Sequence, residues 1–158
     1  IIIGLDSVED RIRISKKFGS TENINVSSLS EQEVIQRVRD LCPPDGADVV
    51  IEVCGQPSVI PSGIEMLRTG GIYVIGGLVN PDAMLTLDGN SILKKMLTIK
   101  GIHNYHPRHL IRALDFVISN KDRFPFAEIV DSKFPLDQID TAFAKAADRS
   151  VLRAAIVP

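Results

Sequence analysis

The sequence predicts an α/β fold with a doubly wound parallel sheet, and two observations favour this class. Short apolar runs of strand length alternate with longer amphipathic stretches along the whole chain. The central apolar runs are continuous and lack the alternation of polar and apolar residues that is typical of a strand with one solvated face. We therefore expect parallel strands with helices covering both faces.

The first predicted elements are a buried strand and a helix with signals at both ends. The stretch IIIGLD begins with three β-branched residues and ends on Asp6. Ser7 is a candidate helix cap, acidic residues follow in the first turn, basic residues stand in the last turn, and Gly19 is a candidate stop. These signals predict a strand over residues 1–6 and a helix over residues 7–19.

The following elements continue the alternation. Ser30 and Glu33 have the spacing of a capping box, and the apolar residues after them fall on one side of a helix. Two prolines at residues 43 and 44 end this helix. The predicted strands are residues 23–26, 48–55, 70–77 and 97–102, and the predicted helices are residues 30–41 and 58–68.

The pattern changes from about residue 103 onward. An amphipathic helix is predicted over residues 108–120, an extended stretch over 126–136, a second helix over 137–149 and a last strand near the end. We therefore predict a boundary here, with residues 1–103 as a nucleotide-binding domain and residues 104–158 as a short α+β tail.

Composition and charge favour a protein that acts on small molecules. The net charge is -2 over 158 residues with both signs interleaved, so neither a nucleic-acid-binding stripe nor a membrane-binding face is expected. The apolar runs are too short to span a bilayer. Cys42 and Cys54 form neither a CxxC pair nor a disulfide framework, which favours a reducing compartment. We expect a cytoplasmic protein.

Candidate functional residues lie where the predicted strands end, because ligands of doubly wound sheets bind at the carboxyl ends of the strands. Asp6 is one of them. An acid at the end of the second strand of a dinucleotide fold accepts hydrogen bonds from the adenosine ribose and repels a 2′-phosphate, which favours NAD over NADP. Alternatively, Asp6 only begins the next helix, where its charge meets the helix dipole.

The glycine-rich phosphate-binding turn GxGxxG is not found in the sequence. We expect it upstream of Ile1, together with the first strand. In the strand order 3-2-1-4-5-6 that strand lies between residues 1–6 and 48–55, so the predicted sheet is incomplete and unstable as an isolated piece.

The chain resembles the cofactor half of the medium-chain dehydrogenase/reductase family, in its zinc-type alcohol dehydrogenase branch. The resemblance covers essentially the whole chain and is carried by GLDSVEDRIRISKKFGSTENINV, GADVVIEVCG, LRTGGIYVIGGLV, LTIKGI and VLRAAIVP. It implies that residues 1–103 are part of an NAD-binding Rossmann domain and that residues 104–158 return to the catalytic domain. It also implies that the zinc ligands and the proton-relay residues belong to an N-terminal domain, so this chain holds no catalytic residue and no metal ligand.

The resemblance further implies a set of cofactor-binding residues. They are Asp6 and Arg11 at the adenosine ribose, Cys54 and Gly55 on the adenine side, Gly77 and Leu78 at the nicotinamide, Ile102 and Asn104 at the carboxamide, and Arg153 near the pyrophosphate. Each has a plain alternative: the glycines as a turn, the cysteine as a small buried apolar residue, and the last arginine as a surface residue.

All three histidines, His103, His106 and His109, stand at three-residue intervals. Three imidazoles could bind zinc if they converged. Pro107 interrupts a helix through them, and this spacing turns successive side chains by roughly 300° rather than along one helix face. A role in a loop and at a helix entry is therefore the favoured interpretation.

Two classes of function are open. In the first, the chain belongs to an NAD-dependent alcohol or polyol dehydrogenase, inactive as this piece alone, that transfers hydride from the alcohol to NAD at a zinc held elsewhere. In the second, it is a non-catalytic nucleotide-binding or scaffold module. We also expect a homodimer or tetramer with a two-fold contact at a short edge strand over Met84–Leu87.

Overall fold

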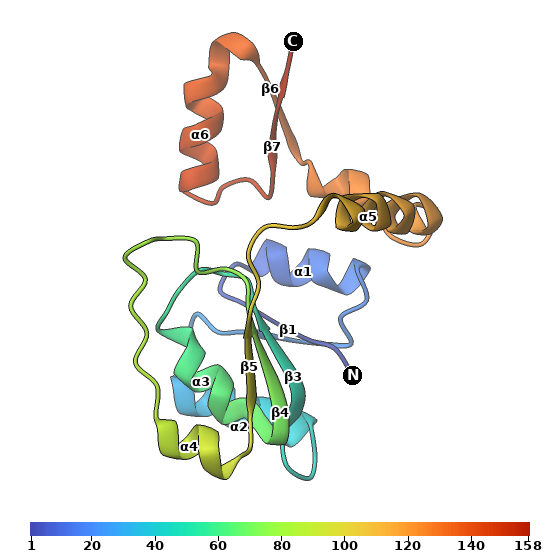
Figure 1. The fold of residues 1–158 in the computed structure, drawn as a ribbon. Coiled ribbons are helices and arrows are strands. Elements are labelled where there is room, and N and C mark those ends of the chain that lie inside the picture. The colour runs from blue at the N-terminus through green and yellow to red at the C-terminus, as the bar shows by residue number, and fades with distance from the viewer. The chain divides into compact units, whose positions relative to one another are not determined.

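The computed structural model describes residues 1–158 and confirms the α/β class (Figure 1). The strands are β1 (Ile3–Asp6), β2 (Glu22–Asn25), β3 (Ala47–Glu52), β4 (Leu67–Ile75), β5 (Thr98–Gly101), β6 (Ser132–Pro135) and β7 (Ala154–Val157). The helices are α1 (Glu9–Lys17), α2 (Glu31–Leu41), α3 (Val59–Met66), α4 (Gly89–Lys94), α5 (Pro107–Asn120) and α6 (Ile139–Ala147), with 3₁₀ turns η1 (Phe126–Ile129) and η2 (Leu136–Gln138).

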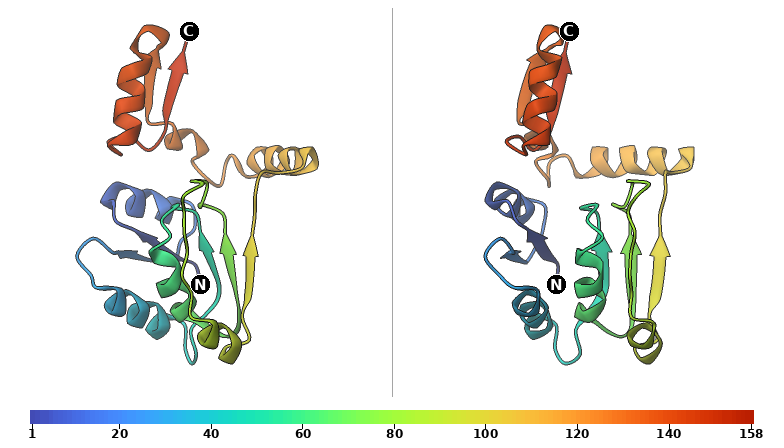
Figure 2. Two further views of the ribbon diagram at one scale, coloured as in Figure 1. Left: turned by 60° about the vertical axis from the view of Figure 1, so that its left-hand side comes forward. Right: turned by 90° about the vertical axis from the view of Figure 1, so that its left-hand side faces the viewer.

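The strands pair in three sheets. The largest has the order β3-β4-β5, and both of its pairings are parallel, as are β6 and β7 (Figure 2). Val50 is paired with Tyr73, which is paired with Ile99, so these three side chains share one face of the large sheet. Parallel pairing brings the carboxyl ends of β3, β4 and β5 to one edge.

The chain forms two compact units. One consists of residues 24–104 and contains the large sheet with α2, α3 and α4. The other consists of residues 1–23 and 105–158 and contains β1, α1, α5 and the β6-α6-β7 segment. The predicted division into residues 1–103 and 104–158 stays a prediction about domain origin.

The core of the 24–104 unit lies between α3 and the large sheet. Ile60, Ile64, Leu67 and Tyr73 are buried together, and partly buried side chains from β3, β4 and β5 surround them. Because side chains alternate along a strand, neighbours of the core-facing residues point away from α3, and Ile51 is 63% exposed. That helices cover both faces of the sheet stays a prediction for the face opposite α3.

The ends of α1 differ in part from the sequence prediction. Ser7 does not cap the helix, because Val8 occupies the N-cap position and makes no side-chain cap. The Asp6 carboxylate instead accepts a hydrogen bond from the Val8 N–H at 2.9 Å, just before α1 begins. Gly19 follows the C-terminal end of the helix, and its N–H donates to the Lys16 carbonyl, as a stop residue would.

The capping box of α2 is confirmed. The Ser30 Oγ accepts from the Glu33 N–H at 3.3 Å, and the Glu33 carboxylate accepts from the Ser30 N–H at 2.8 Å. Hydrogen bonds from the side chain and backbone of Ser30 lower the pKa of the Glu33 carboxyl. Two of the four N–H groups that a helix start leaves unpaired are satisfied in this way.

Replacing Ser30 with alanine is expected to lower the free energy of unfolding of the intact protein by about 1 kcal/mol, because the cap of α2 is lost. Since the folded-state pKa of Glu33 is lowered, the contribution of this residue is present above its unfolded-state pKa and is lost as the pH falls through the folded-state pKa. Urea unfolding at neutral and acidic pH measures both effects. Ser28→Ala in the neighbouring loop is the control, and an equal loss in both variants would contradict the prediction.

The segment between β4 and β5 contains one missed helix and one wrong strand. Asp88 caps α4 by accepting from the N–H groups of Asn90 and Ser91, and this DGNS signal stands in the sequence. The stretch Met84–Leu87 forms no strand, so the predicted sheet edge there is wrong. Leu85 and Leu87 pack against the core of the sheet instead, because burying two leucines outweighs an exposed strand pairing.

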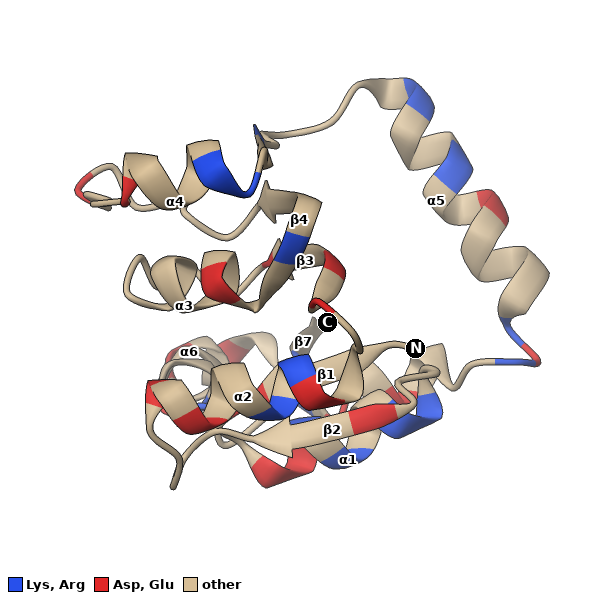
Figure 3. Cartoon of the chain, turned by 90° about the horizontal axis from the view of Figure 1, so that it is seen from below, with Lys and Arg blue, Asp and Glu red and all other residues tan.

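In the unit of residues 1–23 and 105–158, an aromatic cluster joins three segments. Phe18, Phe116, Phe124 and Phe126 have ring centroids 5.6 to 6.4 Å apart. Acidic residues stand in the first turn of α1 and basic residues in its last turn, and α2 also carries both signs (Figure 3). No helix of the chain has the length and apolarity needed to cross a membrane.

Candidate functional site

The carboxyl edge of the large sheet is the first candidate site, because three strands end there side by side. β3 ends at Glu52, β4 at Ile75 and β5 at Gly101. The chain leaves the sheet at this edge in three loops. The predicted site residues from Cys54 to Asn104 all lie in these loops.

Two glycines bring the loops after β3 and β4 into backbone contact. Gly55 has φ +77°, a left-handed conformation that favours glycine, and a Cβ there would lie 2.8 Å from the Gly77 carbonyl oxygen. A Cβ on Gly77 would lie 2.5 Å from the Gly55 nitrogen and 2.7 Å from the Val53 carbonyl carbon. Neither position has room for a side chain. The structure therefore brings these two predicted residues together.

A buried acid that the sequence prediction did not single out holds these loops. Glu52 is 4% exposed. Its Oε1 accepts from the Gly55 N–H at 2.6 Å, and its Oε2 accepts from the Gly77 N–H at 3.2 Å. The available signal is an acid inside the apolar run DVVIEV, where carboxylates are rarely placed without hydrogen-bond partners.

Cys54 is exposed and carries a protonated thiol at neutral pH. Burial, and to a lesser extent the neighbouring Glu52, raises the pKa of this thiol. A thiol must ionise to act as a nucleophile. The side chain of Cys54 therefore supports no nucleophilic role, and its exposure shows that the alternative of a small buried apolar residue is wrong.

The remaining predicted residues of this edge are held by the ends of β4 and β5. The Ile102 N–H donates to the Ile75 carbonyl at 2.9 Å, which extends the strand pairing beyond β5. The Ile102 side chain lies beside Gly76, where a Cβ would be 3.1 Å from the Ile102 Cδ1. Leu78 packs against the core of the sheet. Asn104 has φ 52°, and its amide lies 3.0 Å from the His103 ring.

The other three predicted residues lie in the second unit. Asp6 makes the local hydrogen bond to Val8 described above, so its helix-start alternative has structural support. Arg11 lines a cavity of about 220 Å³ together with residues 149–152. The N–H groups of Leu152 and Arg153 donate to the Asp131 carboxylate at 3.0 and 3.3 Å, and these bonds lower the pKa of Asp131. The Arg153 side chain has no such partner and is exposed.

The three histidines have separate surroundings. His103 is hydrogen-bonded to Asn104, His106 caps α5 by accepting from the Arg108 N–H at 3.3 Å, and His109 neighbours the Arg108 side chain. No three His, Cys, Asp or Glu side chains are grouped in a way that could hold a metal ion. The helix-entry interpretation of His106 is confirmed.

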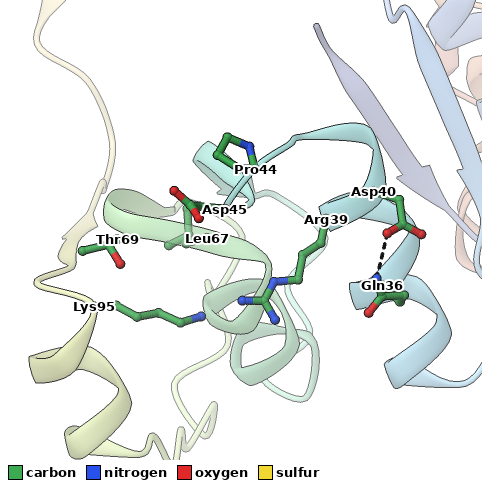
Figure 4. Close-up of a pocket in the computed structure, with 8 residues that line it drawn as sticks. All are labelled: Gln36, Arg39, Asp40, Pro44, Asp45, Leu67, Thr69 and Lys95. Carbon is green, nitrogen blue, oxygen red and sulfur yellow. Dashed lines mark hydrogen bonds between the residues drawn. The ribbon is translucent and has the colours of Figure 1, made fainter.

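A cavity of the 24–104 unit lies at the opposite edge of the sheet. It has a volume of about 330 Å³, and Figure 4 shows the side chains that line it. Asp45 precedes β3 and Leu67 begins β4, so the cavity is at the amino ends of the strands. Lys95 donates to the carbonyls of Ile64 and Glu65 at 3.1 and 3.0 Å and thereby caps α3. Because this cavity lies at the amino ends of the strands, it is not a candidate for the predicted cofactor site, which is expected at the carboxyl ends.

Comparison with known proteins gives a consistent result. The family model described as zinc-binding dehydrogenase matches residues 1–119. The chain is 31% identical over 143 residues to an L-threonine 3-dehydrogenase from Bacillus subtilis, covering 90% of this chain and 40% of that protein. It is 33% identical over 148 residues to an erythritol/L-threitol dehydrogenase from Mycolicibacterium smegmatis, covering 93% of this chain and 38% of that protein.

A solved structure agrees with these relatives. The alcohol dehydrogenase zinc-binding domain protein from Burkholderia ambifaria superposes with a TM-score of 0.84 at 29% identity, over 99% of this chain and 42% of that one. The chain therefore spans about 40% of the length of the proteins it matches. This agreement confirms the resemblance noted from the sequence and the Rossmann-like nature of the fold.

Proposed function

This chain belongs to the zinc-binding dehydrogenase family, and from that membership we propose that it is the cofactor-binding part of an NAD-dependent alcohol or polyol dehydrogenase. The observation that carries the proposal is the contact between Gly55 and Gly77 at the carboxyl edge of a parallel sheet. Backbone without side chains at that edge is what a dinucleotide needs for close approach. The activity and the substrate concern the whole protein.

The residues present suit a dinucleotide in two respects. Gly76 and Gly77 carry no side chains at the end of β4, where the nicotinamide end is proposed to lie. Asp6 offers a second carboxylate oxygen, besides the one bonded to Val8, to the ribose hydroxyls, and Arg11 follows it on α1. When bound, NAD supplies the acceptor for the hydride that leaves the alcohol. Leu78, Ile102, Asn104, Cys54 and Arg153 complete the proposed cofactor shell.

The remaining parts of the proposal concern the whole protein. Two relatives are named for dehydrogenation of L-threonine and of erythritol or L-threitol, which supports a small alcohol or polyol as substrate. The catalytic zinc is proposed to lie in an N-terminal domain, and free cysteines support a cytoplasmic location. A homodimer or tetramer is also proposed, without the edge strand that was expected at Met84–Leu87.

Replacing Asp6 with alanine in the intact protein is expected to weaken NAD binding by about 1 to 3 kcal/mol, because hydrogen bonds to the ribose are lost. NADP binding should weaken less, because the repulsion between the carboxylate and the 2′-phosphate is lost as well. Asp6→Asn is the sharper variant, since its amide oxygen can still accept from the Val8 N–H. Titration of both nucleotides, followed by fluorescence, measures the change in preference.

Glu22→Ala, at an exposed acid of β2, is the matched control and should leave both affinities unchanged. If Asp6→Asn binds NAD as tightly as the original protein, the aspartate only starts the helix. If the intact protein binds NADH but oxidises no alcohol, the non-catalytic nucleotide-binding module is the correct function. If it binds no NADH at all, only a scaffold role is left.

A further inference from the structure

Glu52 is a buried carboxylate without a cationic partner. It is 4% exposed, and none of the ion pairs in the structure includes it. Its negative charge contributes, after burial, to the raised pKa of Tyr73 in the core. A buried charge is costly unless hydrogen bonds compensate it, so the partners of this group indicate its role.

Those partners are two backbone N–H groups from separate loops. Oε1 accepts from Gly55, three residues later in the chain, and Oε2 accepts from Gly77, which is 25 residues away. One carboxylate therefore connects the loop after β3 with the loop after β4. Hydrogen bonds to an ionised carboxylate are stronger than those between neutral groups. Two of them on one carboxylate fix the direction of each N–H group as well as its distance.

The steric environment shows that this connection is closely matched to the glycines. A Cβ on Gly77 would lie 2.5 Å from the Glu52 Oε1 as well as against the Gly55 nitrogen. The carboxylate and the backbone of Gly55 thus fill the space beside Gly77 that a side chain would need. A change in the length or the hydrogen-bonding character of residue 52 must alter the spacing of the two loops.

We propose that Glu52 is a positioning residue that sets the spacing between the loop of Cys54 and Gly55 and the loop of Gly77 and Leu78. This inference rests on the proposed function, in which the first loop contacts the adenine side of NAD and the second supports the nicotinamide. A dinucleotide that contacts both loops at once needs their spacing to be correct. A mononucleotide that contacts one loop does not.

The test compares NADH with AMP on the intact protein. Glu52→Gln keeps the size of the side chain, but its NH₂ group then faces one of the two N–H donors. We expect the dissociation constant for NADH to rise at least tenfold and that for AMP to change less than threefold. Glu65→Gln on α3 is the matched control, because it removes a carboxylate that bonds Ser91 away from this edge, and it should change neither value.

Glu52→Asp is the second variant, since it keeps the charge but shortens the reach by one methylene. We again expect the dissociation constant for NADH to rise at least tenfold and that for AMP to change less than threefold. Equal losses for the two nucleotides, no loss for NADH, or failure of both variants to fold would each overturn the positioning role. If the unaltered protein does not bind NADH, the proposed function itself is wrong. This outcome can be told apart from the three outcomes that overturn only the positioning role of Glu52.

Discussion

Replacing Ile60 with alanine is expected to lower the free energy of unfolding of the intact protein by about 2 to 5 kcal/mol. Ile60 is fully buried, with an exposure of 0%, between α3 and β4. It packs with Leu67 and Tyr73, which are 0% and 1% exposed. These neighbours belong to the large sheet and cannot collapse into the space that three lost carbons leave, so a cavity adds to the lost transfer energy.

Chemical denaturation of the intact protein, with the transition of this part followed by hydrogen exchange, measures the loss. Val59→Ala is the matched control, because it removes apolar atoms from the same helix at a side chain that is 41% exposed. We expect a loss below about 1 kcal/mol for the control, since an exposed side chain has less burial to lose. Equal losses for the two variants would show that the core lies elsewhere.

Replacing Gly77 with alanine is expected to reduce NADH affinity about 100-fold, with a similar loss in kcat/KM for the alcohol. The new Cβ would lie 2.5 Å from both the Glu52 Oε1 and the Gly55 nitrogen, and 2.7 Å from the Val53 carbonyl carbon. Backbone atoms cannot rotate away as a flexible side chain can. The loop after β4 must therefore move by roughly 1 Å, which is a displacement large enough to spoil the alignment of reacting groups.

Gly89→Ala tests whether the effect is specific to position 77. Gly89 begins α4, and a Cβ there would have no neighbour within 4 Å, so the substitution adds only a methyl group in open space. NADH binding should be unchanged in this variant. Retention of NADH affinity in Gly77→Ala would remove the loop after β4 from the cofactor site.

Hydrophobic periodicity and capping signals were enough to predict most of the elements. They predicted the order of strands and helices up to β4 and again from β5 to α6, because each signal lies within one or two helical turns, but they missed α4. The capping box of Ser30 and Glu33 is an example, since its two partners are three residues apart. The ends of these strands were predicted to within three residues: β3 ends at Glu52 rather than at residue 55, and β4 ends at Ile75 rather than at residue 77, so Gly55 and Gly77 lie in the loops that follow.

Features that depend on packing could not be predicted in the same way. The Met84–Leu87 stretch has the apolar content of a strand, but Leu85 and Leu87 pack against the core formed by α3 and β4. Local composition indicates that a residue can be buried, and tertiary contacts decide against what.

The role of Glu52 shows the same division at the site. Its place in a strand follows from the sequence, because it lies within the predicted strand 48–55, although β3 ends at this residue. Its two hydrogen bonds do not follow from the sequence, since they are accepted from backbone N–H groups. Every residue except proline carries such a group, and no sequence pattern distinguishes one from another. Only the parallel pairing of β3 with β4 brings Gly77 within reach of this carboxylate, across 25 residues of chain.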